Sequence, residues 1–366
     1  MVSIPLRVGL IGGSPRGSWG TTAHIPALQS LPRYAVTAVC TAHQETADET
    51  ARLFNIPHAL VDPIQLVQHA EVDIVAVNVR VPAHYELVMA AIDAGKHVYS
   101  EWPLGRNTEE ATRMFEAAER KGVRHAVGLQ GRVSPSITYV RDLIQQGYIG
   151  KPLSGTLFVN AANWGASLDR SYQADFANGA NLMTITGGHN LDALCFCLGE
   201  FREVSAFAVS QRDTIPADDA GRAIPKDVPD QLVVSGVTTS GAVISAQVRG
   251  GMSRGQEFLF EIHGSEGDLV LSATMRASTQ RQELRVQGAQ GAAKDLTDLE
   301  IPAQYRWVPA SVPAGSPYNV AQLYAKLGDA IRDGKPAVPG FDAAITRHRM
   351  LDMIVRASRT GQKQVA

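Results

Sequence analysis

The sequence predicts two domains: a doubly wound α/β domain with a parallel sheet, then an α+β domain with a large, mainly antiparallel open sheet. The chain has 366 residues, more than the roughly 250–300 that one hydrophobic core usually supports. Its first third alternates short apolar runs with helical segments, as a parallel sheet covered on both faces requires. Beyond residue 130, several strands alternate apolar and polar residues, which is typical of an antiparallel sheet with one wet face.

The first domain is expected to span residues 1–130. Its Val-, Ile- and Ala-rich runs predict buried parallel strands, and right-handed crossovers between them give a nucleotide-binding topology. The expected strands are Arg7–Ile11, Ala35–Thr41, Ala59–Val61, Asp73–Val79, His97–Ser100 and Arg124–Gly128. The expected helices are Thr22–Leu31, Gln44–Phe54, Pro63–Gln68, His84–Ala94 and Thr108–Lys121.

The second domain, residues 131–366, is expected to carry the substrate and oligomerisation surfaces. Helices are predicted at Ser134–Gln146 and Met183–Leu198, and a long exposed loop at Thr214–Asp230. The expected strands are Leu153–Asn160, Glu203–Gln211, Gln231–Thr238, Ala242–Arg249, Glu257–His263, Asp268–Ser272 and Glu283–Val286. Two closing helices belong to this domain or pack back on the first: Val320–Asp333 and Asp342–Ser358.

The overall composition argues against several classes of function. The formal net charge is −2, and no stretch approaches the roughly 20 apolar residues that span a bilayer. Electrostatics therefore predict neither nucleic-acid nor membrane binding. The three cysteines (Cys40, Cys195 and Cys197) are too few for a disulfide framework or a zinc site, so no bound metal is expected. With no apolar leader at the N-terminus, a cytoplasmic location is expected.

A glycine-rich loop follows the first expected strand. It spans residues 12–20, with the sequence GGSPRGSWG, and opens a helix. Glycine lets the backbone turn sharply and approach a pyrophosphate, which the N–H groups at the start of a helix bind. Gly12 and Gly17 have the spacing of the first and third glycines of the dinucleotide fingerprint, whereas Ser14 holds the middle place. The loop therefore predicts a Rossmann fold whose cofactor-binding residues include Gly12, Gly13, Ser14, Gly17 and Trp19.

The end of the second strand gives a weaker indication of which dinucleotide is bound. An acidic residue there would hold the ribose 2′-hydroxyl of NAD, but the sequence runs CTAHQ from Cys40. Thr41 and His43 are able to donate hydrogen bonds to a 2′-phosphate, which slightly favours NADP over NAD. The alternative is that both residues merely begin a surface helix.

Five segments occur in an order typical of one protein family. Asp93–Leu104 resembles a strand and turn with a Glu-Lys-Pro motif, and Val81–His84 resembles a Thr-Pro-Asn-x-x-His turn. Gln146–Gly150 resembles a junction into a sheet domain, Ile262–Gly267 a sheet turn and Tyr324–Pro336 a closing helix. The whole chain thus resembles the glucose–fructose oxidoreductase / inositol dehydrogenase (Gfo/Idh/MocA) family. The resemblance implies further cofactor-binding residues, namely Val81, His84, Glu101, Trp102 and Gln130.

A closer resemblance exists within the family. Glu101-Trp102, Leu129–Pro135 and Gly188–Asp192 are similar to segments of the fungal galactose-pathway regulator branch. Members of that branch bind a dinucleotide but act by protein–protein contact. The resemblance therefore implies two different functions.

The resemblance also implies where the chemistry of a family enzyme lies. Such an enzyme removes a hydroxyl proton from a sugar or polyol while hydride passes to the nicotinamide. The implied base is His189, which would face the nicotinamide, and Tyr172 assists it. Asp192, three residues further on a helix, either orients the His189 ring or only satisfies the helix surface. The family's lysine is replaced by Trp102, and the aspartate expected four residues before the histidine is replaced by Ile185.

Aromatic and polar residues predict a carbohydrate-like substrate. Trp102 either walls the pocket by stacking on a sugar or on the nicotinamide, or is plain packing at a turn. Lys96 precedes its strand, at the sheet end remote from the nicotinamide, so it does not replace the missing lysine. The resemblance places four residues near the substrate: Arg132, Asn163, Trp164 and Asp169.

These observations leave three functions open. The first is an NAD(P)-dependent oxidoreductase acting on a sugar-like alcohol or ketone, and we favour it. The second is a catalytically silent dinucleotide-binding regulator, and the third is a lyase or hydrolase that uses the cofactor transiently. A homo-oligomer, either a dimer or a tetramer, is expected because a sheet covered by helices on one side needs its other apolar face covered.

Overall fold

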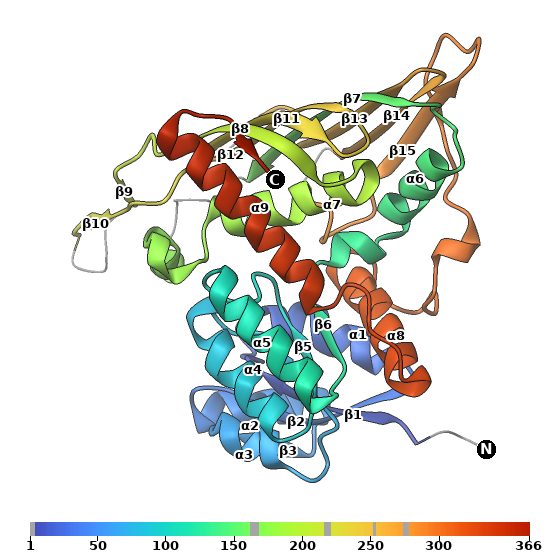
Figure 1. Ribbon diagram of the computed structural model, residues 1–366. Coiled ribbons are helices and arrows are strands. Elements are labelled where there is room, and N and C mark those ends of the chain that lie inside the picture. The colour runs from blue at the N-terminus through green and yellow to red at the C-terminus, as the bar shows by residue number, and fades with distance from the viewer. Residues whose placement is uncertain (1–3, 162–167, 216–220, 252–253, 274–277) are drawn as a thin grey trace. The chain divides into compact units, whose positions relative to one another are not determined.

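The computed structural model describes residues 4–161, 168–215, 221–251, 254–273 and 278–366 (Figure 1). The chain folds into two compact units. Unit 1 comprises Met1–Gln130 and Arg306–Thr346, and unit 2 comprises Gly131–Tyr305 and Arg347–Ala366. A segment near the end of the chain thus belongs with the N-terminal residues.

Unit 1 is built on a six-stranded sheet in the order β3-β2-β1-β4-β5-β6. Every pair of neighbouring strands is parallel, and the order reverses direction between β1 and β4, as in a doubly wound nucleotide fold. This confirms the predicted fold class. The strands are β1 Leu6–Ile11, β2 Tyr34–Cys40, β3 His58–Leu60, β4 Ile74–Val77, β5 His97–Ser100 and β6 His125–Val127.

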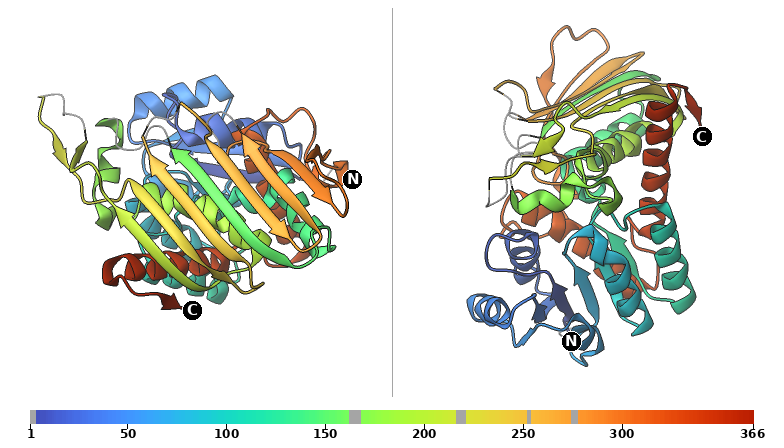
Figure 2. Two further views of the ribbon diagram at one scale, coloured as in Figure 1. Left: turned by 90° about the horizontal axis from the view of Figure 1, so that it is seen from above. Right: turned by 90° about the vertical axis from the view of Figure 1, so that its left-hand side faces the viewer.

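Helices cover both faces of this sheet (Figure 2). An added Cβ on Gly9 would meet Leu66 of α3, whereas the Leu10 side chain reaches Gly13 and Gly20. Because successive strand residues point to opposite faces, α3 and the glycine loop lie on opposite sides of β1. The helices are the π-helix η1 Gly20–His24, α1 Ile25–Gln29, α2 Gln44–Phe54, α3 Pro63–Gln68, the 3₁₀ turn η2 Val81–Ala83, α4 His84–Asp93 and α5 Thr108–Lys121.

The late helix α8 (Ser316–Asp333) completes unit 1 by packing on η1 and α1. Tyr34 of β2 donates a hydrogen bond of 2.5 Å to the carbonyl oxygen of Tyr324. Gly328 permits this approach, since a Cβ there would lie 2.5 Å from the Tyr34 hydroxyl. The helix contributes Tyr324 to the interior of the unit, where its side chain is fully buried.

Unit 2 is built on a nine-stranded sheet in the order β16-β15-β14-β13-β7-β12-β11-β8-β17. Its neighbouring strands are antiparallel except β7 and β12, which confirms a mainly antiparallel sheet. The strands are β7 Pro152–Ala161, β8 Phe201–Val209, β11 Gln231–Thr238, β12 Val243–Gly250, β13 Phe258–Gly264, β14 Gly267–Ala273, β15 Arg285–Gln290, β16 Thr297–Asp298 and β17 Gln364–Val365.

The prediction of an exposed loop at Thr214–Asp230 was wrong in part. Its described residues include a short strand pair, β9 Thr214–Ile215 and β10 Ile224–Pro225. Asp230 is buried and accepts a 2.8 Å hydrogen bond from Lys226. The polar composition suggested solvent exposure, but this ion pair lets the charged end of the segment pack inside.

One face of the unit 2 sheet is covered by α6 Pro135–Gln145, α7 Gly188–Leu198 and the part of α9 (Phe341–Thr360) that lies in this unit. In the described chain no helix lies on the other face (Figure 2). Phe207 and Val233, partners on neighbouring strands, are exposed there. Val209 and Val243 are also exposed. The outer face of the sheet therefore exposes several apolar side chains on β8, β11 and β12.

Candidate functional site

The glycine loop is braced by hydroxyl groups from the loop itself and from η1 and α2. The hydroxyls of Ser18 and Thr21 donate to the Ser14 carbonyl oxygen at 2.8 and 3.0 Å. Thr50 of α2 donates to the Gly13 carbonyl oxygen at 2.8 Å. The serine in the place of the middle glycine thus accepts two hydrogen bonds that hold the turn in one conformation.

Glycine is required at two positions of this loop for different reasons. Gly12 has a φ of +100°, and a Cβ there would lie 2.5 Å from the carbonyl oxygen of Asn78. Gly17 has a φ of +76°, and a Cβ there would have no heavy atom within 4 Å. The loop is therefore tightly packed against β4 at Gly12 and open at Gly17, an open backbone that an anion is able to approach.

Other groups in and beside the loop fit a dinucleotide. Trp19 is half-buried, and Arg16, which was not among the expected cofactor-binding residues, is exposed. Asn78 follows β4, and its buried Oδ1 has no hydrogen-bond partner among the described residues. A buried amide oxygen without a partner is costly unless a ligand or water binds it. The residues present thus fit a polar ligand at the carboxyl edge of the sheet.

The residues after β2 divide into a buried one and an exposed one. The Thr41 hydroxyl donates to the His43 carbonyl oxygen at 3.0 Å and lies 2.7 Å from the Thr46 hydroxyl, so it braces the start of α2. His43 is exposed immediately before that helix. Of the two predicted ribose-reading residues, His43 is the one with an accessible side chain.

His84 holds two turns together. Its ring is buried, with Nδ1 at 2.9 Å from the Pro103 carbonyl oxygen and Nε2 at 3.0 Å from that of Val79. Burial lowers the pKa of His84, and the two carbonyl oxygens act in the opposite direction. Both nitrogens are therefore engaged by backbone, and the residue positions the turn after β5. Val81, which begins η2, is also buried.

A buried polar network surrounds the end of β5, and we name its five residues the Glu101 network. Nε2 of His24 contacts Glu101 Oε1 at 2.8 Å, and Nδ1 contacts the Tyr324 hydroxyl at 2.8 Å. Nε2 of Gln130 donates to both carboxylate oxygens of Glu101 at 3.0 Å and to the Tyr99 hydroxyl at 3.1 Å. The network belongs wholly to unit 1 and fixes the Glu101 carboxylate.

The network is closely packed. Tyr99 and Tyr324 stack with centroids 4.8 Å apart, and burial raises the pKa of both phenols well above its usual value. A Cβ on Gly128 would overlap the Glu101 carboxylate and lie 3.0 Å from Gln130 Nε2. Among the described residues, the other amide atom, Gln130 Oε1, is buried without a partner. Glu101 and Gln130 were expected from the sequence as site residues, whereas His24, Tyr99 and Tyr324 were not.

Trp102 follows Glu101 directly and is 4% exposed. Lys96 lies at the opposite end of β5, where its ammonium donates to the carbonyl oxygens of His69 and Val72 at 3.0 and 2.7 Å. The lysine is thus held at the amino edge of the sheet. This agrees with the sequence-based expectation that it does not replace the lysine of the Glu-Lys-Pro motif.

In unit 2, His189 lies just after an irregular stretch of helix. The predicted helix Met183–Leu198 begins as a π-helix, η6 Leu182–Gly187, which Asn181 caps by accepting from the amides of Met183 and Thr184. Single π turns occur frequently at functional sites. His189 is 5% exposed, and its carbonyl oxygen accepts from the Thr279 hydroxyl at 3.3 Å.

Asp192 lies in a buried ionic cluster with Arg132, Glu200 and Arg347, which we name the Asp192 cluster. Its carboxylate accepts from Arg132 at 2.7–3.1 Å and from Arg347 at 3.0 Å. Arg347 also donates to Glu200 at 2.8 and 3.1 Å. Burial by itself raises the pKa of Asp192, but the two guanidinium groups outweigh it and hold that pKa below its ordinary value. Two predicted site residues therefore pair with one another.

Two of the remaining predicted residues, Asp169 and Tyr172, lie in a 3₁₀ segment, η4 Leu168–Ala174. The Tyr172 hydroxyl accepts from Gln173 Nε2 at 3.0 Å, and its carbonyl oxygen accepts from Asn178 at 2.8 Å. Asn163 and Trp164 lie outside the described residues, and so does the side chain of Asp169.

Two family models match the chain. Residues 6–129 match the model described as "Oxidoreductase family, NAD-binding Rossmann fold", and residues 135–273 match "Gal80p, C-terminal domain". The fold and these matches define a two-domain protein whose N-terminal part is an NAD-binding Rossmann domain of an oxidoreductase family. Residues 6–129 thus belong to the Rossmann domain of the Gfo/Idh/MocA family, and residues 135–273 to a C-terminal domain of the Gal80p type.

Curated relatives include both regulators and dehydrogenases. The chain is 29% identical over 289 residues to galactose/lactose metabolism regulatory protein GAL80 of Saccharomyces cerevisiae, covering 73% of this chain and 66% of that protein. It is 35% identical over 211 residues to dehydrogenase aclE of Aspergillus oryzae, covering 55% and 57%. The chain thus spans less than two thirds of these relatives. It is 29% identical to levoglucosan dehydrogenase of Pseudarthrobacter phenanthrenivorans, covering 75% of each.

Solved structures share the fold. The apo form of levoglucosan dehydrogenase has a TM-score of 0.87 at 24% identity and covers 100% of this chain and 99% of its own. A super-repressor mutant of Gal80p from Saccharomyces cerevisiae has a TM-score of 0.86 at 23% identity, covering 99% and 97%. Separately, none of the helices in the described residues combines the length and apolar character needed to cross a bilayer.

Proposed function

We propose that this protein binds a nicotinamide dinucleotide and transfers hydride between it and a carbohydrate-like alcohol or ketone. The observation that carries the proposal is the carboxyl edge of the unit 1 sheet. There the braced glycine loop, open at Gly17, leads through η1 to His24 and the Glu101 network. Levoglucosan dehydrogenase, which shares the fold, has structures in complex with NADH and levoglucosan or L-sorbose.

The dinucleotide fits residues at this edge. The loop amides around Gly17 bind the pyrophosphate, and the exposed Arg16 and His43 read the 2′ position of the adenosine ribose, which favours NADP. Val81, Glu101, Trp102 and Gln130 lie toward the nicotinamide, and His84 positions the turn that carries Trp102. When bound, the nicotinamide supplies the hydride acceptor or donor at C4.

The acid–base work falls to His189. Its imidazole takes the proton of the substrate hydroxyl during oxidation and returns it during reduction. Asp192 supports it by fixing α7 through Arg132 and Arg347, and Tyr172 assists with its phenolic hydroxyl. Trp102, in the place of the lysine, presents an apolar face to the sugar ring or nicotinamide. The substrate contacts proposed are Arg132, Asn163, Trp164 and Asp169.

Dinucleotide titration and turnover test this function. Purified protein is titrated with NADH and NADPH by fluorescence, and NAD(P)H oxidation is then followed with a panel of keto-sugars. His189→Ala is expected to lower kcat by about 10²–10⁴ while leaving dinucleotide affinity unchanged. A wild-type protein that binds neither dinucleotide contradicts the proposal.

A second candidate function is a catalytically silent regulator whose dinucleotide occupancy controls a protein partner. Trp102 favours it, because the lysine that family enzymes use for the substrate hydroxyl is absent. The match of residues 135–273 to the Gal80p C-terminal domain also favours it. Dinucleotide binding without turnover, unchanged in Trp102→Lys, supports the regulator. Sugar oxidation gained by Trp102→Lys indicates a scaffold that lost its chemistry at this residue.

We also infer a homo-oligomer. The outer face of the unit 2 sheet exposes Phe207, Val209, Val233 and Val243, and a second copy of the chain would cover this apolar surface. Sedimentation of wild type and Phe207→Glu distinguishes a dimer or tetramer from a monomer.

A further inference from the structure

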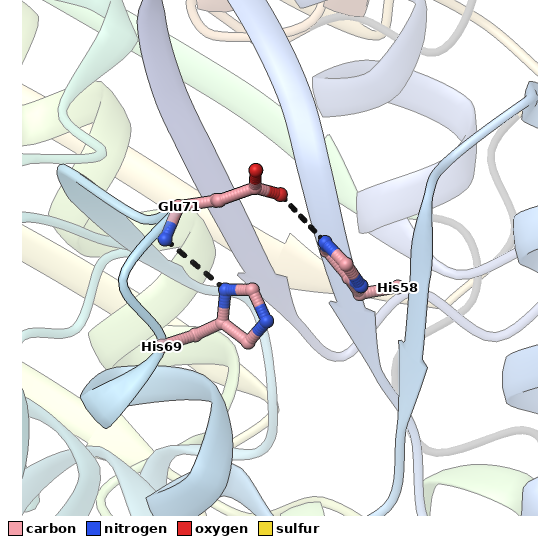
Figure 3. Close-up of side chains that lie close together, drawn as sticks. All are labelled: His58, His69 and Glu71. Atoms are coloured by element: carbon pink, nitrogen blue, oxygen red, sulfur yellow. Dashed lines mark hydrogen bonds and ion pairs between the residues drawn. The ribbon is translucent and has the colours of Figure 1, made fainter.

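Two histidines and a glutamate converge on the surface of unit 1, away from the glycine loop and the Glu101 network. His58, His69 and Glu71 each offer one ligand atom, and these atoms lie within 4.8 Å of one another. Nε2 of His58 contacts Glu71 Oε2 at 2.7 Å, and the two imidazole centroids are 4.3 Å apart (Figure 3). The side chains are partly exposed, so a solvated ion has access to them.

The backbone that carries the three residues is held in place independently of their side chains. His58 begins the edge strand β3 and pairs with Ala38 of β2. The carbonyl oxygen of His69 accepts from Lys96 at 3.0 Å, and that of Glu71 accepts from Thr37 at 2.6 Å. The loop from α3 to β4 and the start of β3 are therefore fixed before any ligand binds, which reduces the entropy cost of binding.

We propose that His58, His69 and Glu71 bind a divalent transition-metal ion such as Zn²⁺. Two imidazoles and one carboxylate are a ligand set that zinc prefers, and three protein ligands leave further positions for water. Zinc–ligand bonds of about 2.0–2.1 Å in a tetrahedron place neighbouring ligands about 3.3 Å apart. The ion thus replaces the proton that His58 and Glu71 share, once the distance between Nε2 of His58 and Oε2 of Glu71 has increased slightly from its present 2.7 Å.

His69 must change one hydrogen bond to take part. Its Nδ1 now accepts from the Glu71 amide at 3.1 Å. Glu71 is exposed, so water is able to take over this amide when the ring turns toward the ion. The histidine keeps its place in the chain, because the carbonyl oxygen that Lys96 holds lies on its backbone.

The surrounding charges nearly balance. Arg7 is engaged by Asp73 through contacts of 2.6–3.0 Å, so its charge is largely compensated. Lys96 remains as a cation, and Glu71 supplies the one carboxylate in the ligand set. A singly charged ligand set with a neighbouring cation favours an ion that binds imidazole strongly, and disfavours Mg²⁺ and Ca²⁺, which prefer several oxygens.

The test is titration of the metal-stripped full chain with ZnCl₂ by isothermal calorimetry. Wild type is expected to bind one Zn²⁺ at this site, and His58→Ala, His69→Ala and Glu71→Gln each weaken binding at least about tenfold. His263→Ala is a matched control, since His263 and Asp268 form an exposed histidine–carboxylate pair at 2.8 Å on unit 2. It is expected to keep wild-type zinc affinity.

Two results overturn the proposal. One is zinc binding by wild type that is unchanged in both His58→Ala and His69→Ala, and the other is equal weakening in His263→Ala. Circular dichroism of each variant confirms folding, and the near-isosteric Glu71→Gln keeps the test valid if an alanine variant is destabilised. Co²⁺ gives a second readout, because its visible absorption changes when imidazole ligands are lost.

Discussion

The hydroxyl of Tyr324 lies 2.8 Å from Nδ1 of His24, although 300 residues separate them in the sequence. This contact orients the His24 ring so that Nε2 meets Glu101. The shape of the carboxyl edge of unit 1 thus depends on a helix that the chain makes near its end.

Tyr324→Phe removes the hydroxyl and leaves Nδ1 of a fully buried histidine without this partner. We expect a loss of about 1–3 kcal/mol in the free energy of unfolding, the cost of an unsatisfied buried group, and weaker dinucleotide binding. Urea denaturation and NADPH titration measure the two effects. Tyr318→Phe on the same helix is the control and should change neither, whereas an unaltered Tyr324→Phe protein would show that the contact is dispensable.

Gly128→Ala is expected to displace the Glu101 carboxylate. The new Cβ overlaps that carboxylate, and overpacking of this kind costs about 1–3 kcal/mol. Dinucleotide affinity should fall with stability, whereas Gly255→Ala, where a Cβ has open space, should leave both unchanged. Wild-type affinity in Gly128→Ala would mean that Glu101 does not form part of the cofactor site.

Asp192→Asn leaves two buried guanidinium groups without their shared carboxylate. Breaking a buried ion pair by removing one partner costs about 3–5 kcal/mol. Because the pKa of Asp192 is lowered in the folded state, its stabilisation is present above the unfolded-state pKa and is lost as the pH falls through the folded-state value. Asp298→Asn, which removes an exposed pair with Arg285, should have no measurable effect on urea denaturation.

We expect a second loss of stability on acidification, caused by the buried His348. Burial lowers its pKa from 6.5 to about 4, so between these values the unfolded chain binds a proton that the folded chain does not. The contribution of His348 to the free energy of unfolding is therefore fully present above about pH 6.5. It falls as the pH drops, by about 2 kcal/mol at pH 5. His348→Gln should flatten this dependence in urea denaturation at pH 7 and pH 5. The exposed His263→Gln should keep the wild-type slope.

The choice of dinucleotide is predicted to rest on Arg16 and His43, the exposed polar groups near the expected ribose 2′ position. Arg16→Gln and His43→Ala should each weaken NADPH binding about tenfold, as expected for loss of a charge-assisted hydrogen bond, and leave NADH affinity unchanged. NADH thus serves as the internal control. Equal weakening of both dinucleotides would assign these residues to the pyrophosphate instead.

The sequence by itself determined the Rossmann topology, the open sheet and most element positions. The bounds of α2, α3 and α5 match the predicted ranges, because local signals set them: apolar periodicity, and caps such as Asp62 and Asn107. The glycine loop could also be predicted from the sequence, because the spacing of its glycines is a local feature. What only the tertiary structure decided are the pairings of distant residues: His24 with Tyr324, Asp192 with Arg347, and His58 with Glu71. Side chains that folding brings together from distant parts of the chain produce no periodic pattern in the sequence. These three pairs, including the candidate metal ligands His58 and Glu71, can therefore be identified only in the folded structure.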